Sequence, residues 1–294
     1  MTLFLEVTQG GYMGLRINTN VASLNAQRNL RGTRLNLDKT LEQLSSGQRI
    51  NRAGDDAAGL AISENLKAQI RGMSQAERNA QDGVSLVQIA EGGLTEISNI
   101  LIRLRELGVQ AASDTIGPTE RKFLNVEFEQ LVSEVDRIAQ STEFNRVPLL
   151  NGTGAVFDIQ IGTRNDPVSD RLTFDASSAD VNVAALGLNL ASVSDKISAQ
   201  NSLAAIDQAI ISVSGIRADF GALQNRLQST VNNITISIEN LSSANSRVRD
   251  TDIASATAEL TKNNILMQAG TSVLAQANQS TTSALSLINA ASNG

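Results

Sequence analysis

Apolar residues recur at seven-residue intervals in the second half of the chain. From position 206 every seventh residue up to position 248 is apolar, and no proline interrupts this stretch. A repeat of 3.5 residues sustained over this length is typical of a long helix in a left-handed supercoil. We call these positions the rod core seam: Ile206, Val213, Phe220, Leu227, Ile234, Leu241 and Val248.

A second row of positions accompanies the rod core seam. It is apolar at both ends, but Arg217 and Gln224 stand in its middle. These two residues are either a buried device that fixes the register of the helices or an outward-facing turn of the supercoil, and the pattern leaves both open. As one helix, residues 203–248 would span about 70 Å at 1.5 Å per residue. That length predicts a helical rod and excludes a compact globule.

Two earlier segments supply partners for this helix. Apolar residues recur every seven positions from Leu66 to Leu101, and at alternating steps of four and three from Leu124 to Ile138. The stretch "DTIGPTE" around Pro118 separates the two segments and is typical of a turn. Helices joined by short connections pack as antiparallel neighbours, so we expect three helices that bury their seams against one another.

The period changes between the second and third of these helices. In "AVFDIQIGT" apolar and polar residues alternate, which indicates a strand, and "RLTFDA" repeats the pattern after the turn-rich "TRNDPVSDR". The sequence therefore predicts a small β-hairpin element inserted at about residues 145–190.

Both ends of the chain carry further heptad rows. Leu30, Leu37 and Leu44 form one near the N-terminus, and near the C-terminus small or uncharged residues accompany a row of large ones. From residue 261 to residue 294, Lys262 is the only charged residue. We call the large C-terminal row the assembly helix seam: Ile253, Leu260, Met267 and Leu274.

An exposed helix normally carries charges for solubility. The uncharged C-terminal helix is therefore typical of one that copies of itself surround. Two outcomes stay open for the chain ends: they become ordered only on assembly, or they pair within one molecule as an ordinary coiled coil.

The composition excludes most kinds of catalytic and metal-binding site. The chain contains no Cys and no His, which excludes disulfides, thiol nucleophiles, thiolate or imidazole metal ligands and the commonest general base. A net charge of −6 argues against nucleic-acid binding. No segment has the roughly 20 apolar residues of a membrane span, and no signal peptide is visible. We expect no catalytic, metal or cofactor site, and a chain that is cytosolic or exported without a cleaved leader.

The segment "SSGQRINRAGDDAAGLAISENL" contains the one acidic pair that resembles a site. Asp55 precedes a helical pattern and suits an N-cap, and both Asp55 and Asp56 suit the positive end of a helix dipole. Adjacent helical residues do not share a face, so the two carboxylates would not converge on one ion. Together with Gly54 and Gly59, which provide backbone freedom, the pair predicts a joint between two helical domains rather than a metal site.

Five blocks of the sequence are similar to one known family. They are "LRINTNVASLNAQRNL", "LSSGQRINRAGDDAAGLAIS", "TEFNRVPLLNG", "SRVRDTDIASATAEL" and "ILMQAGTSVLAQANQ". In this order they resemble the two ends of bacterial flagellin, the subunit of the flagellar filament, and they cover about half of the chain.

The resemblance implies a secreted structural protein that assembles with copies of itself into the extracellular filament used for swimming. It implies export in an unfolded state through the flagellar type III channel, and as partners an export chaperone, hook-associated proteins and the filament cap. It predicts no enzymatic activity and no cofactor.

The resemblance also implies a mainly α fold with two parts. Residues 14–54 and 250–294 would form an inner coiled-coil domain of paired terminal helices. Residues 55–249 would form a helical rod domain with the small β-hairpin. About fifty residues separate the second and third rod helices, so this is a minimal form without outer domains. Residues 1–13 precede the usual family start and are a leader or a misassigned start.

Other functions are weighed against this one. The alternative within the same class is the hook–filament junction protein, although "QAGTSVLAQANQ" favours flagellin. A zinc metalloprotease insertion is excluded because there is no His, and an adhesin would need an outer domain. Resemblance also assigns Arg103, Leu107 and Glu127 to a contact with the vertebrate Toll-like receptor that senses flagellin, or else to packing within the filament.

Overall fold

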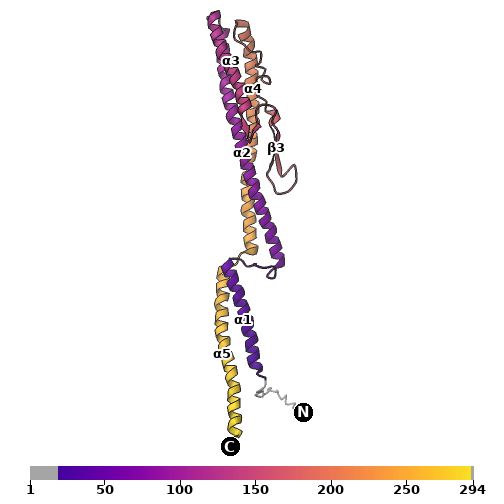
Figure 1. Ribbon diagram of the computed structural model, residues 1–294, viewed down its shortest axis with the longest axis vertical. Coiled ribbons are helices and arrows are strands. Elements are labelled where there is room, and N and C mark those ends of the chain that lie inside the picture. The colour runs from indigo at the N-terminus through magenta and orange to yellow at the C-terminus, as the bar shows by residue number, and fades with distance from the viewer. Residues whose placement is uncertain (1–18, 293–294) are drawn as a thin grey trace, which may run out of the picture. The chain divides into compact units, whose positions relative to one another are not determined.

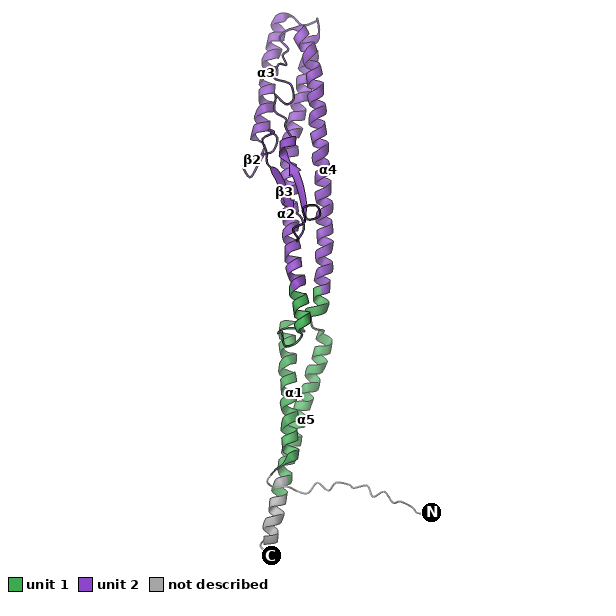
Figure 2. Ribbon diagram, turned by 90° about the vertical axis from the view of Figure 1, so that its right-hand side faces the viewer, with its two compact units in different colours: residues 1–64, 245–294 green, residues 65–244 purple. Residues whose placement is uncertain are grey.

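The computed structural model describes residues 19–292, except for the side chains of residue 281 and of residues 284–292. The predicted leader, residues 1–13, lies outside the described residues. The chain forms two compact units, one from residues up to 64 together with those from 245 onward, and one from residues 65–244 (Figure 2). The sequence analysis placed this boundary after residue 54 and before residue 250.

Long helices account for most of the described chain, and the mainly α fold with a small β-hairpin is confirmed (Figure 1). Helices α2 and α4 each contribute residues to both units. The α-helices of the described residues are α1 (Val21–Ser46), α2 (Ala57–Ala112), α3 (Pro118–Ser141), α4 (Lys196–Arg249) and α5 (Ile253–Ser292).

Local sequence explains where these helices begin and end. The Asn20 side chain accepts a hydrogen bond from the backbone N–H of Ser23 and caps α1. Asp195 and Asp252 do the same for α4 and α5, and Pro118 occupies the first position of α3. Gly47 ends α1 in the left-handed conformation, with φ at 70°.

The unit of residues 65–244 is built on one apolar core shared by α2, α3 and α4. Of the rod core seam on α4, Ile206, Val213, Phe220, Leu227 and Ile234 are buried, whereas Leu241 and Val248 are half-buried. The largest fully buried side chains from the other helices include Leu94, Ile97 and Leu101 of α2 and Phe128 of α3.

The two polar residues of the companion row are half-buried on α4. One guanidinium nitrogen of Arg217 lies 3.8 Å from a carboxylate oxygen of Glu91 on α2. Its Nε is buried and has no hydrogen-bond partner in the described part of the chain. Arg217 therefore fits neither interpretation completely: it is not a fully paired buried residue, and it does not face fully outward into solvent.

The predicted hairpin consists of β3 (Val156–Gln160) and β4 (Arg171–Asp175), paired antiparallel. The register places Phe157 opposite Phe174, and the Phe174 ring lies 5.0 Å from the Phe220 ring of α4. Gly83 of α2 explains how the hairpin packs so closely. A Cβ at Gly83 would stand 2.6 Å from Ile159 Cδ1, so a side chain there would have to displace the end of Ile159.

Two shorter features flank the hairpin. Strands β1 (Glu143–Phe144) and β2 (Val147–Pro148) pair around a tight turn that the sequence analysis did not predict. Both turn residues, Asn145 and Arg146, have positive φ, as a two-residue hairpin turn requires. A short 3₁₀ helix, η1 (Ala176–Ser178), follows β4 directly.

Candidate functional site

The loop between α1 and α2 is bound to the residues that link α4 to α5. We call this region the joint, residues 47–56 with 246–252. The backbone N–H of Arg49 donates to the carbonyl of Arg249 at 2.7 Å, and that of Thr251 donates to the carbonyl of Gly47 at 3.0 Å. Gln48 and Asp250 form an isolated antiparallel bridge. The joint thus holds both connections by main-chain hydrogen bonds, which do not depend on side-chain identity.

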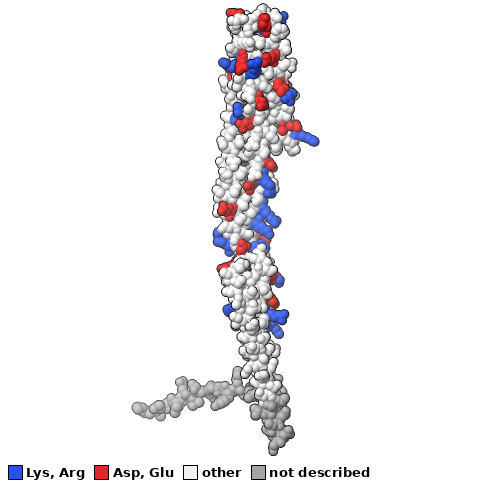
Figure 3. All heavy atoms as spheres, turned by 90° about the vertical axis from the view of Figure 1, so that its left-hand side faces the viewer, with Lys and Arg blue, Asp and Glu red and all other residues white. Residues whose placement is uncertain are grey.

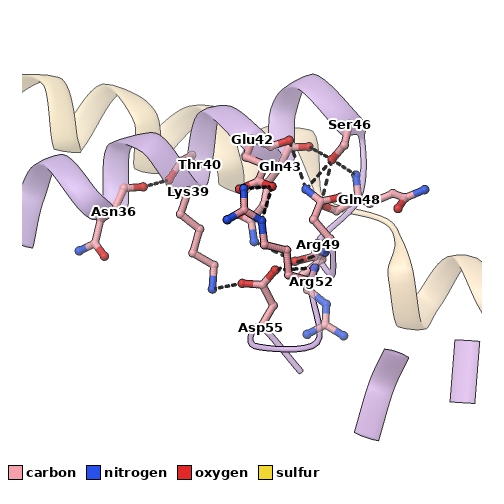
Figure 4. A network of polar contacts seen from close by, with 11 residues as sticks. Asn36, Lys39, Thr40, Glu42, Gln43, Ser46, Gln48, Arg49, Arg52 and Asp55 are labelled. Carbon is pink, nitrogen blue, oxygen red and sulfur yellow. Dashed lines mark hydrogen bonds and ion pairs between the residues drawn. The ribbon is translucent and has the colours of Figure 1, made fainter. Parts of the chain in front are cut away.

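The two aspartates of the joint have different partners, and Figure 4 shows those of Asp55. Asp55 Oδ1 lies 2.9 Å from Lys39 Nζ, and Asp55 Oδ2 accepts hydrogen bonds from the backbone N–H groups of Asn51 and Arg52. Asp56 Oδ2 lies 4.0 Å from Arg49 instead. Carboxylates with separate partners form no shared proton or ion site.

The Lys39 ammonium holds the pKa of Asp55 below its ordinary value, and the backbone N–H of Arg52 lowers it further. Both interactions favour the charged carboxylate because each places a donor against it. Asp55 therefore acts as a charged anchor between the joint and the last turns of α1.

The expectation that Asp55 caps the following helix is wrong. Helix α2 begins at Ala57, and Asp56 accepts the hydrogen bond from the backbone N–H of Gly59 at 2.8 Å. Gly59 is needed for space, because a Cβ there would collide with the Asp56 carboxylate and with Ile50. Gly54 has open space around it and no positive φ, so the expected need for glycine at this position is not met.

Arg249 is a central residue of the joint that the sequence analysis missed. Its side chain is only 15% exposed, and it donates to Gln48 Oε1 at 2.9 Å and to the Glu64 carboxylate. Ser63 Oγ donates to Asn245 Oδ1 at 2.8 Å beside it. The quoted block "SRVRDTD" contained Arg249, but a basic residue in the last turn of a helix gives no sign of its partners about two hundred positions earlier.

Helices α1 and α5 pair antiparallel in the same unit, so the arrangement seen is pairing within one molecule. Ser23 Oγ donates to Asn278 Oδ1, and Asn20 Nδ2 donates to the carbonyl of Ala277. A Cβ at Gly270 would stand 2.6 Å from Leu30 Cδ2. Steps of seven from that pair place Leu37 opposite Asn263 and Leu44 opposite Ala256.

The leucines of α1 therefore face a row of small or polar residues on α5. That row contains the most buried of the described side chains of α5, with Ala256 at 7%, Asn263 at 4% and Ala277 at 9% exposure. The assembly helix seam lies beside this row: Leu260, Met267 and Leu274 are half-buried, and Ile253 is exposed.

Asn263 is the exception in this buried row. Its Nδ2 has no hydrogen-bond partner among the residues that the structure describes. A buried amide left without a partner opposes folding by about 1–3 kcal/mol. The α1–α5 pair is therefore weak, because α5 contributes mostly small side chains to the contact and one of its buried residues has an unpaired amide.

The side of α5 away from this buried row exposes large apolar side chains among uncharged polar ones. We call it the outer face of α5, marked by Ile265, Leu266 and Val273, which are 61%, 45% and 58% exposed. No charged residue follows Lys262 in the sequence. In Figure 3 the visible face of this unit carries fewer charged side chains towards the C-terminal part of α5. Large apolar side chains exposed on a helix with few charges favour protein–protein contact at this surface.

The three residues assigned to receptor contact lie in the other unit. Arg103 donates to Glu127 Oε1 from two nitrogens, at 2.8 and 3.0 Å, and both side chains are about half exposed. Leu107 is fully buried, so its assignment as a direct surface contact is wrong. Of the three assigned residues, Arg103 and Glu127 are the two that lie at the surface.

The described residues support neither a metal site nor a membrane-spanning helix. No group of three or more His, Cys, Asp or Glu side chains there could hold a metal ion. None of the described helices is long and apolar enough to cross a membrane.

Comparison with known proteins identifies two family models in this chain. The bacterial flagellin N-terminal helical region matches residues 17–155, and the bacterial flagellin C-terminal helical region matches residues 203–288. A flagellin of Halalkalibacterium halodurans is 45% identical over 92% of this chain and 99% of its own length. A flagellin of Bacillus subtilis is 43% identical over 93% of this chain and all of its own length.

A solved structure gives a more distant comparison. A putative flagellar hook-associated protein from Vibrio parahaemolyticus is 14% identical, with a TM-score of 0.54 over 67% of this chain and 100% of its own. At that identity the likeness shows a shared fold and does not favour a hook-associated function.

Proposed function

This chain belongs to the bacterial flagellin family, and we infer from that membership and from its surfaces how it performs the family's structural role. It is a structural subunit of the extracellular flagellar filament, and it builds that filament by association with copies of itself. We propose residues 14–54 and 250–294 as the inner domain and residues 55–249 as the rod.

The main support for this proposal is the outer face of α5. Its apolar side chains are exposed in one copy, and the helix has no charges beyond Lys262 to keep such a surface soluble. A surface that binds a different surface on the next copy produces an open helical polymer, whereas a self-complementary surface produces a closed dimer. Because the α1 side of α5 is already occupied, the outer face remains for neighbouring copies.

Truncation tests this role directly. A chain that ends at Thr251 loses α5 but keeps all of residues 65–244, where most of the apolar core lies. We expect it to stay folded and soluble, and to form no filaments when seeded, as observed by electron microscopy beside the full chain. Normal filament growth by the truncated chain would overturn the proposal.

The weakness of the α1–α5 pair supports a second part of the proposal. The terminal helices gain most of their burial in the filament, and their order increases on assembly. Amide exchange on the monomer should then find residues 19–44 and 255–290 weakly protected, in contrast to the core of α2. Equal protection of both regions would show that the pair is already complete in the monomer.

Export and its partners follow from the same features. We propose that the chain passes through the flagellar export channel unfolded, and that a chaperone covers the outer face of α5 before assembly. Hook-associated proteins and the filament cap would contact the same kind of surface at the two ends of the polymer.

Receptor contact is proposed only for the Arg103–Glu127 pair. Arg137 and Glu134 form a matched control, since they are an ion pair of similar exposure on α3. Arg103→Ala should reduce signalling by the Toll-like receptor more than Arg137→Ala does. Equal signalling by both variants would remove this contact.

A further inference from the structure

We propose that the loop joining β3 to β4 of one copy docks into a cleft between β4 and α4 of a second copy. The docking element is the loop of residues 164–169, with Val168 as the side chain that enters. This inference rests on the proposed self-assembly and names one surface pair that produces it.

Val168 is held out in solvent by a loop with its own internal hydrogen bonds. Its side chain is 88% exposed, and Figure 1 shows the loop beyond β3 extending away from the helices. Asp166 Oδ1 accepts a hydrogen bond from the backbone N–H of Val168, and Oδ2 accepts one from Ser169 Oγ. Pro167 fixes the backbone between them. A loop ordered in advance loses less entropy when it binds.

The cleft offers an apolar floor to such a side chain. It has a volume of about 340 Å³ and lies between the end of β4 and one face of α4. Phe220 and Leu223 of α4 and Phe174 of β4 line its floor, and Ala222 lies at its exposed rim. A cleft of this volume has room for one branched aliphatic side chain, whose burial the hydrophobic effect would favour.

The loop and the cleft each carry charges of both signs, and one pair across them is complementary. Arg164 of the loop is exposed, and its guanidinium has no ion pair in the described part of the chain. Asp219, on the rim of the cleft, is also exposed, and no hydrogen bond or ion pair of its carboxylate occurs among the described residues. An Arg–carboxylate contact beside the apolar one would select the orientation of the incoming loop.

The loop cannot occupy the cleft of its own chain. Strand β4 begins at Arg171, next to the loop, and the cleft lies at its other end, with Phe174 and Asp175. Four residues of strand span about 13 Å. Loop and cleft are thus separate surfaces on one molecule. Such a head-to-tail contact repeats from copy to copy without closing, as a filament requires.

Disulfide trapping tests the contact, because the natural chain contains no cysteine. The variant Val168→Cys with Ala222→Cys in one chain is seeded to polymerise, oxidised, and run on a denaturing gel without reductant. Each copy then offers one thiol to each neighbour. We expect the monomer band to shift to a ladder of linked multimers, and the same variant to remain monomeric when oxidised before seeding.

Two further samples make the result specific. Copolymers of the two single-cysteine variants should give linked dimers and nothing longer, because each copy can be linked only once. The matched control is Leu190→Cys with Ala222→Cys, since Leu190 is 89% exposed but lies outside the loop; it should give no ladder.

Two outcomes overturn the docking proposal: filaments of the Val168 variant that yield no ladder, or a ladder of equal intensity from the Leu190 control. In both cases filaments have formed, so the proposed function stands. If the natural chain forms no filaments under the same conditions, the proposed function itself fails.

Discussion

Two adjacent glycines in α2 have opposite surroundings. A Cβ at Gly92 would meet nothing within 4 Å, whereas one at Gly93 would stand 2.7 Å from Thr142 Oγ1 and 2.9 Å from Leu150 Cδ1. Glycine within a helix is about 1 kcal/mol less favourable than alanine, so Gly92→Ala should stabilise the protein by about that amount. In Gly93→Ala the collision opposes this gain, and overpacking typically costs about 1–3 kcal/mol. Thermal unfolding of both variants measures the difference; equal stabilisation would contradict the packing described for Gly93.

Asp55 makes the joint sensitive to acid. Because its pKa is lower in the folded chain than its ordinary value near 3.8, its contribution is complete above that value and is lost as the pH falls through the lowered pKa. In the natural chain, the amide signals of Asn51 and Arg52 should therefore shift together during an NMR titration below about pH 4. Asp55→Asn keeps an acceptor for both amides but carries no charge, so its signals should not titrate. Identical titrations of the two proteins would show that another group controls the joint.

Single residues of the joint were the hardest to assign from sequence. The acidic pair and its glycines predicted a joint, because both residue types are common where helices begin and chains turn. They did not show which aspartate caps α2, since a difference of one position depends on where the helix begins. Nor could they show that Lys39 lies beside Asp55, because that contact requires the loop to fold back along α1.

At the scale of elements, the heptad pattern predicted the helices better than the faces that they bury. A repeat of 3.5 residues produces two adjacent rows, and either can face a partner. On α4 the large row is the most buried, because α2 and α3 provide a broad apolar surface. On α5 the small row is the most buried, since the leucines of α1 fill the space in front of it. The size of the residues on the partner helix decided the outcome, and no single segment contains that information.

Asn263 provides a test of why the α1–α5 pair is weak. Asn263→Ala removes a buried amide without a partner and makes this position match Ala256 and Ala277 in the same row. The pair should become more stable by about 1 kcal/mol, measured as increased amide protection in α1 of the monomer. Thr40→Ala is the control: Thr40 is buried to the same extent, but its hydroxyl is bonded to the carbonyl of Asn36. An equal gain in both variants would mean that the amide is not the cause.

At the scale of the whole molecule, family membership was predictable from the sequence because five blocks carry it in order. The hairpin was also predictable, since alternation over Val156–Gln160 and Arg171–Asp175 is a local property. Its position against α2 was not. It involves a close approach to Gly83, which lies more than seventy residues earlier and has no local sign of that contact. The same is true of the cleft between β4 and α4, which exists only once the hairpin has packed.

Assembly should fail when charge is placed on the outer face of α5. Val273 is exposed in one copy, so Val273→Glu should leave the folding of the monomer unchanged. In a filament the same carboxylate would be buried between copies without a partner, which is strongly unfavourable. Seeded growth followed by light scattering should therefore lose most of its amplitude. Ser255→Glu is the matched control, because it adds the same charge to α5 beside Asp252 and Glu259, where charge is already tolerated. If Val273→Glu polymerises as well as Ser255→Glu, the outer face is not the surface that joins the copies.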